Sequence, residues 1–93
     1  MENLKIEVKS KEESAEAQGL LFELGYHWAF KNIGKDFLYD DKDVFLFAIG
    51  CGDILTGSEE NRDYFKEHHA KEVTINQLKD MVVLKRNDVG DAT

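Results

Sequence analysis

The sequence predicts an α+β fold, a single small domain in which an antiparallel β meander of about four strands packs against one main helix, with a short C-terminal helix after it. Its 93 residues are the length of one domain. One strand pattern precedes a long helix pattern, and several short strand patterns with tight turns follow. The domain is expected to span residues 1–86. Residues 87–93 are small or polar and lack periodicity, so they are expected to form a flexible tail.

The first strand is expected over about residues 3–9. Leu4, Ile6 and Val8 alternate there with charged residues. A period of two is typical of a strand with one face on the core and the other in water. Lys5 and its charged neighbours are therefore expected to face solvent.

The main helix is expected to begin at Lys11, because Ser10 and Glu13 form a capping box just before it. Gly25 supplies the residue that adopts a left-handed conformation after the last turn of the helix. Between these signals, the apolar residues have the i, i+3, i+4, i+7 spacing of a helix that packs one face on a core. They are Ala17, Leu20, Leu21 and Leu24.

Two further strands are expected to form an aromatic hairpin. Tyr26, Trp28 and Phe30 occupy alternate positions. After a turn, the pattern resumes with Phe37 and Tyr39.

The best core candidate is the continuous apolar run at residues 44–49, which is typical of a central strand covered on both faces. Turn residues at 50–53 then return the chain in a short antiparallel strand. Residues 59–69 are expected to form a helical turn in which Tyr64 and Phe65 pack inward.

The short C-terminal helix is expected over about residues 75–82, because Thr74 and Gln77 form a second capping box. Its apolar residues have helical spacing. An alternative for residues 81–84 is a strand.

The acidic excess lies in the middle of the chain. The sequence has 19 acidic and 12 basic residues, a net charge of −7. Residues 36–63 hold eight of the acids and only Lys42 and Arg62 as bases. Such a segment repels phosphate backbones and attracts a basic protein surface, so no direct contact with nucleic acid is expected. The alternative is that these acids only keep a small protein soluble and monomeric.

Aromatic residues crowd residues 26–30, and tryptophan is a favoured anchor of protein interfaces. The alternative is that every ring belongs to the core, since a domain this small needs all its large apolar groups. The residues expected to bind a partner are the acids of the middle segment and one aromatic. They are Asp36, Asp40, Asp41, Asp43, Asp53, Glu59, Glu60, Asp63 and Trp28.

No catalytic, metal or cofactor site is expected. The acids at 40–43 lack the glycine and glutamate spacing of a calcium loop, and the histidines and Cys51 lack the paired spacing of zinc ligands. Cys51 has no flanking signature of a nucleophile. As a lone cysteine it forms no internal disulfide, which favours the cytoplasm. The longest apolar run, 44–49, is too short to cross a membrane.

Several stretches resemble small acidic accessory proteins that tailed bacteriophages and prophages encode. These are QGLLFELGYHW at residues 18–28, Gly52-Asp53-Ile54, Tyr64-Phe65 and KEVTINQL at residues 71–78, and the likeness covers about residues 4–81. The resemblance implies a protein of the host cell cytoplasm that binds and blocks a host protein, such as restriction, CRISPR or other defence machinery. It implies no site residue.

The leading hypothesis is a noncatalytic protein-binding module, monomeric or homodimeric. It would inhibit a host defence or nucleic-acid-handling protein by binding its basic surface. An alternative is a protein that binds a small molecule or sequesters a nucleotide signal, with a pocket lined by Tyr26, Trp28 and His68. A third is a hydrolase that uses Cys51 and a histidine.

Overall fold

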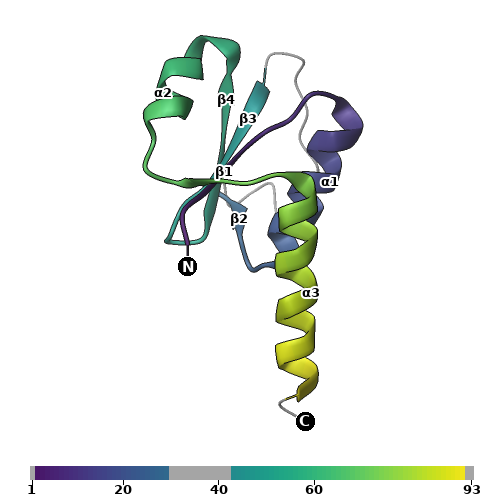
Figure 1. Ribbon diagram of the computed structural model, residues 1–93. Helices are drawn as coiled ribbons and strands as arrows, with labels where there is room; N and C mark the ends of the chain where they lie inside the picture. The colour runs from purple at the N-terminus through teal and green to yellow at the C-terminus, as the bar shows by residue number, and fades with distance from the viewer. Residues whose placement is uncertain (1, 30–42, 92–93) are drawn as a thin grey trace.

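The structure, a computed structural model, describes residues 2–29 and 43–91 (Figure 1). The expected strand around Phe37 and Tyr39 lies outside these residues. In chain order, the helices and strands are β1 Leu4–Glu7, α1 Lys11–Glu23, β2 His27–Trp28, β3 Asp43–Ala48, β4 Asp53–Ser58, the 3₁₀ helix η1 Glu59–Asn61, α2 Arg62–Glu67, β5 Lys71–Glu72 and α3 Ile75–Asp91.

The strands form one mixed sheet in the order β2-β4-β3-β1-β5. The α+β class is confirmed, but the purely antiparallel meander is wrong. β3 pairs antiparallel with β1 and β4, whereas β2 pairs parallel with β4 and β5 parallel with β1. The reason lies in the connections: a helix that crosses a sheet brings the chain back to start the next strand in the same direction. α1 makes such a crossover between β1 and β2, and η1 with α2 makes another between β4 and β5.

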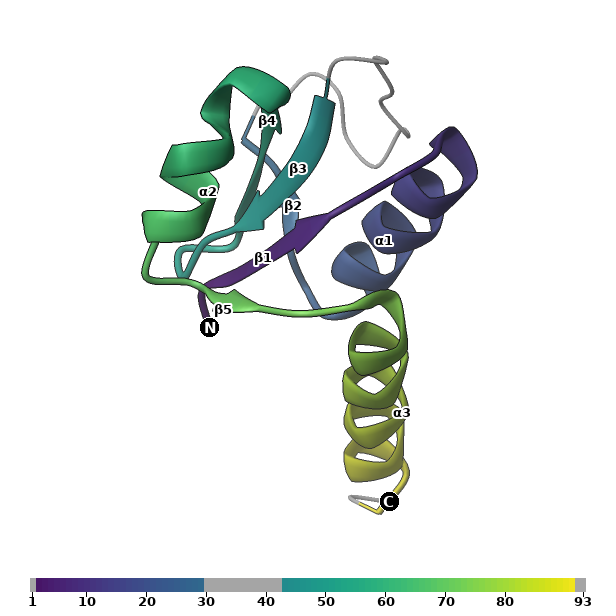
Figure 2. The same cartoon turned by 45° about the horizontal axis from the view of Figure 1, so that its top comes forward.

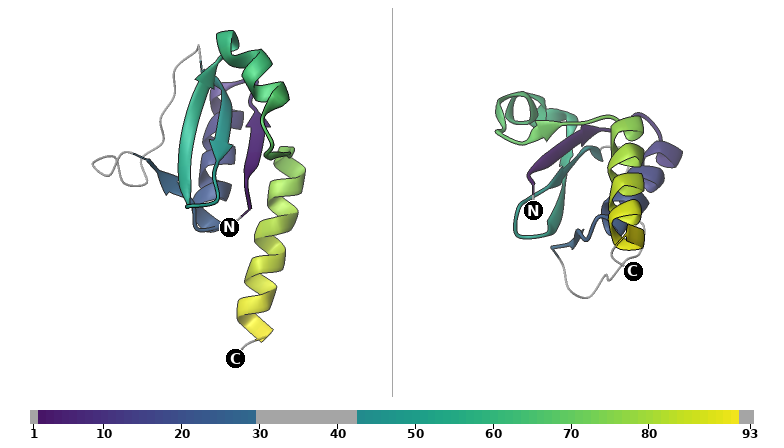
Figure 3. Two further views of the ribbon diagram at one scale, coloured as in Figure 1. Left: turned by 90° about the vertical axis from the view of Figure 1, so that its left-hand side faces the viewer. Right: turned by 60° about the horizontal axis from the view of Figure 1, so that its bottom comes forward.

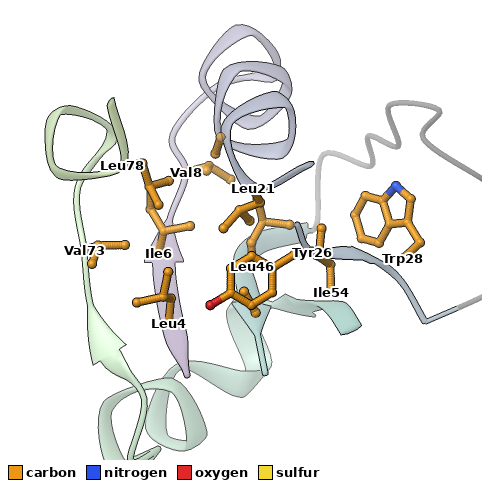
Figure 4. Close-up of a cluster of buried hydrophobic side chains, with 12 residues drawn as sticks. Leu4, Ile6, Val8, Leu21, Tyr26, Trp28, Leu46, Ile54, Val73 and Leu78 are labelled. Atoms are coloured by element: carbon orange, nitrogen blue, oxygen red, sulfur yellow. The ribbon is translucent and has the colours of Figure 1, made fainter. Parts of the chain in front are cut away.

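Both faces of the sheet are covered, as predicted for the central strand. Figure 2 shows α2 on one side of the sheet and α1 with α3 on the other. Along β3, Leu46 and Ala48 belong to the larger core cluster on the α1 side, and Phe45 and Phe47 pack with Phe65 of α2. Figure 4 shows the larger cluster, which joins β1, α1, β2, β3, β4 and α3.

The hydroxyl half of the predicted capping box of α1 is present. The Ser10 Oγ accepts a hydrogen bond from the Glu13 backbone N–H at 3.1 Å. Gly25 has a φ of 101°, the left-handed backbone that favours glycine after a helix. The buried stripe of α1 includes Ala17 and Leu21, as the spacing indicated, and also the polar Gln18, whose amide donates to Ser14 Oγ at 2.8 Å.

The C-terminal helix begins where the sequence predicts and is much longer than expected. Gln77 N–H donates to Thr74 Oγ1 at 3.2 Å and Thr74 N–H donates to Gln77 Oε1 at 2.8 Å, which completes the capping box. α3 then continues for 17 residues to Asp91, so the strand alternative at 81–84 and the tail at 87–91 are corrected to helix. The chain has no proline to stop the helix. The C-terminal end of α3 projects away from the sheet (Figure 1).

Two exposed ion pairs join α1 to α3. Glu16 pairs with Lys79 at 2.8 Å and Glu23 pairs with Arg86 at 2.6 Å. The two pairs are separated by the same number of residues along each helix, so α1 and α3 run in parallel, side by side (Figure 3).

Lys5 does not face water as the alternation predicted. The residue is only 5% exposed, because α2 covers this face of β1. The ammonium donates to the backbone carbonyls of Phe65, of Lys66 at 3.3 Å and of His68 at 3.1 Å, all at the C-terminal end of α2. The same group lies 4.9 Å from the centre of the Phe65 ring. Lys5 therefore caps the C-terminal end of α2, where the negative end of the helix dipole also favours a cation.

The buried phenol of Tyr26 is expected to make the stability of the fold depend on pH in alkaline solution. Its ring is buried and its hydroxyl donates to the Glu2 carbonyl. Burial raises the pKa of the Tyr26 phenol above its usual range, and the nearby Glu2 charge raises it further. The stability that depends on neutral Tyr26 is therefore present below about pH 10 and is lost as the pH rises through the folded-state pKa.

We expect Tyr26 to ionise above the ordinary tyrosine pKa of about 10, together with loss of the far-ultraviolet circular dichroism. Absorbance of tyrosinate at about 295 nm and circular dichroism, recorded on one alkaline titration, check this. Tyr26→Phe removes the ionisable group, so its unfolding midpoint should move to higher pH. An unchanged midpoint would contradict this role of Tyr26.

Candidate protein-binding surface

The predicted acidic residues do not all lie together. Asp53 begins β4, whereas Glu59, Glu60 and Asp63 follow its other end, on η1 and α2. A strand of six residues separates the two ends by roughly 17 Å. Asp53 lies instead beside His27, with 3.6 Å between Asp53 Oδ1 and His27 Nδ1.

The remaining acids of the middle segment are placed only in part. Asp36, Asp40 and Asp41 lie outside the described residues. Asp43 begins β3, and its backbone is in register with Ser58 at the end of β4. This puts the Asp43 backbone at the same end of the sheet as η1.

Arg62 neutralises Glu59. The guanidinium donates to both Glu59 carboxylate oxygens and to Glu7 Oε2, the last at 3.0 Å, and it lies 5.2 Å from the centre of the Phe45 ring. The hydrogen bond from Arg62 lowers the pKa of Glu59. In turn, the hydrogen bonds to Glu59 and Glu7 raise the pKa of Arg62. The Glu59 carboxylate is therefore paired within the protein, and its charge attracts a partner only weakly.

Three other carboxylates on η1 and α2 remain open to solvent. Glu60, Asp63 and Glu67 are exposed, and none of them has an ion pair within the part of the chain that the structure describes. Lys66 is an exposed base on the same segment. Glu67 was not among the predicted binding residues, because it lies just beyond the acidic middle segment.

Tyr64 is the exposed aromatic residue of this region. The residue is 58% exposed, whereas neighbouring Phe65 is buried and stacks on Phe45 with ring centres 4.3 Å apart. The prediction that both rings pack inward is thus half wrong, because adjacent positions on a helix point about 100° apart. The Tyr64 ring meets the edges of Phe47 and His68, with ring centres 5.5 Å and 5.3 Å away.

A small cavity of about 150 Å³ adjoins these rings. Its walls come from β3, β4, η1 and α2 with the residue after α2, and Phe47 and Leu55 are in register on neighbouring strands. The lining residues are Phe47, Ile49, Leu55, Thr56, Gly57, Asn61, Tyr64 and His68. We refer to the exposed side chains of residues 59–68, together with this cavity, as the η1–α2 surface.

Trp28, which the sequence assigned to the partner surface, is only 3% exposed and belongs to the larger core cluster. Its ring contacts Phe22 edge to face at 6.4 Å between centres. The proposed small-molecule pocket is not assembled either. Tyr26 and Trp28 lie in the cluster on the α1 side, while the His68 ring packs on Phe47 on the α2 side.

The other residues considered for chemistry are Cys51 and the possible metal ligands. Cys51 is exposed in the turn between β3 and β4, where Gly52 has a φ of 99°. Within residues 2–29 and 43–91, no three histidine, cysteine or acidic side chains come together as metal ligands. None of the described helices has the length and apolarity needed to span a membrane.

The η1–α2 surface combines open carboxylates, an exposed aromatic ring and a cavity. Exposed aromatic rings and charged groups of this kind occur at protein interfaces. No family model, curated protein or solved structure matches this chain.

Proposed function

We propose that this protein is a noncatalytic binding module that docks on a basic protein surface through its η1–α2 surface. The observation that carries the proposal is the placement of Glu60 and Asp63, both exposed and without ion pairs among the described residues, within the four residues that precede exposed Tyr64. Open carboxylates steer a basic partner during encounter. An exposed tyrosine supplies contact area at low entropic cost.

The resemblance to phage accessory proteins favours a specific form of this proposal. The partner is then a host protein of defence or nucleic-acid handling, and the module blocks its basic surface. Because that surface binds phosphates, the module and nucleic acid are expected to compete for it.

The test is affinity capture from host lysate with the protein immobilised, at about 50 mM and about 500 mM salt. The variant Glu60→Gln/Asp63→Asn removes two charges from the η1–α2 surface. Glu12→Gln/Asp80→Asn is the matched control, because it removes the same charge from exposed residues of α1 and α3 that form no ion pair among the described residues.

We expect the wild type and the control to capture a common partner that the first variant loses. With the purified partner, the association rate at low salt should fall by about tenfold in the first variant. Equal capture and equal rates for the two variants would show that the η1–α2 surface is not the interface.

A further inference from the structure

We infer that the cavity of the η1–α2 surface receives an arginine side chain of the partner. This inference rests on the proposed function and names the group that the surface recognises. A volume of about 150 Å³ is below the roughly 300–1,000 Å³ typical of pockets for small molecules. It suits the insertion of one long side chain.

Aromatic rings form much of the cavity wall. Phe47, Tyr64 and His68 meet pairwise with ring centres 5.3–5.5 Å apart and interplanar angles of 55–63°. Phe47 is buried and Tyr64 is largely exposed, so a group that enters from solvent meets the tyrosine first. Aromatic rings attract cations, and a planar, weakly hydrated guanidinium stacks on them better than an ammonium does.

The cavity depends on Gly57. A β-carbon placed there would lie 3.0 Å from Phe47 Cε2, closer than ordinary van der Waals contact. The missing side chain lets the Phe47 ring lie across β4 and line the cavity. Leu55, in register with Phe47, provides apolar surface for the methylene stem of the arginine.

Charge and polar atoms favour arginine over an apolar side chain. The exposed carboxylates of Glu60 and Asp63 lie just before Tyr64 in the chain and have no ion pair among the described residues. Thr56 and Asn61 add polar atoms to the wall. Asn61 is held in place because its Oδ1 accepts from the Ser58 backbone N–H at 3.0 Å. A guanidinium brings five donors to the polar atoms of the wall and a positive charge that these nearby carboxylates attract.

The test is nuclear magnetic resonance of the full-length, ¹⁵N-labelled protein titrated with short Gly-Ser peptides that carry one central residue. The central residue is arginine, lysine, leucine or citrulline, the neutral isostere of arginine. We expect the arginine peptide to shift the amides of Leu55, Tyr64 and His68 in a saturable way. Lysine and citrulline peptides should bind about fivefold to tenfold more weakly.

Tyr64→Ala should abolish the arginine response. Its wild-type side chain is mostly exposed, so an unchanged melting temperature is expected and serves as the folding control. Glu12→Gln/Asp80→Asn should leave the response intact. The inference is overturned by tighter binding of the leucine peptide, by equal responses to arginine and lysine that survive Tyr64→Ala, or by no saturable response to arginine.

The lysate capture separates this inference from the proposed function. A partner that is retained by Tyr64→Ala and lost by Glu60→Gln/Asp63→Asn would overturn the arginine site and leave the proposed function standing. Saturable arginine binding without any charge-dependent protein partner would overturn the proposed function alone.

Discussion

Lys5→Met is expected to lower the free energy of unfolding by about 2–3 kcal/mol, whereas Lys9→Met should change it by less than about 0.5 kcal/mol. The Lys5 ammonium is the donor to three carbonyls at the end of α2. Methionine keeps the length and apolar stem of the side chain but leaves those carbonyls without this partner. Each unsatisfied buried group costs about 1–3 kcal/mol, and relief of the buried charge offsets only part of the loss.

Urea unfolding followed by the fluorescence of buried Trp28 measures both variants. Lys9 is the matched control because it is exposed and follows the same strand. Hydrogen exchange adds a local readout, since the amides of α2 should exchange faster in Lys5→Met than those of α1. Equal unfolding curves for the two variants would show that Lys5 does not hold α2 on the sheet.

Local patterns predict the starts of the helices well. The Ser10 cap of α1 and the Thr74–Gln77 capping box of α3 lie where the sequence indicates, because side chains and backbone groups three residues apart meet without help from the rest of the fold. The continuous apolar run of β3 likewise predicts a strand covered on both faces.

Contacts between distant residues explain what the patterns miss. Lys5 looks like a solvent-facing strand residue until α2, some 60 residues later, covers it. The strand partners of β2 and β5 depend on how α1 and α2 cross the sheet, which period and turn signals do not encode. The sequence predicts too short a C-terminal helix because polar residues near a terminus are typical of a tail. In the structure, α1 contacts α3 as far along as Arg86, which pairs with Glu23.

The candidate surface is only partly visible in the sequence. The acidic middle segment includes Glu60 and Asp63, which are exposed in the structure, because charge can be read directly from the sequence. The choice between Tyr64 and Phe65 depends on how α2 docks, and the burial of Trp28 depends on core packing. Neither is a local property, so the exposed aromatic residue of the surface emerges only from the structure.

Leu78→Ala is expected to cost about 2–5 kcal/mol of unfolding free energy, and Leu84→Ala less than about 0.5 kcal/mol. Leu78 is fully buried in the larger core cluster, while Leu84 is 63% exposed farther along the same helix. Both changes replace leucine by alanine within α3, so their effects on helix propensity nearly cancel in the comparison. The difference between them isolates the burial of one side chain.

The two unfolding free energies also decide what holds α3 on the domain. The Glu16–Lys79 and Glu23–Arg86 pairs are exposed, and such pairs contribute at most about 1 kcal/mol. Burial of Leu78 and Val82 must then supply most of the docking energy. If Leu78→Ala were no more harmful than Leu84→Ala while Arg86→Gln was strongly destabilising, the ion pairs would be the anchor instead. We expect the reverse, with Arg86→Gln within about 1 kcal/mol of the wild type. Solvent screens exposed charges, but it does not weaken the stabilisation that comes from burying apolar side chains.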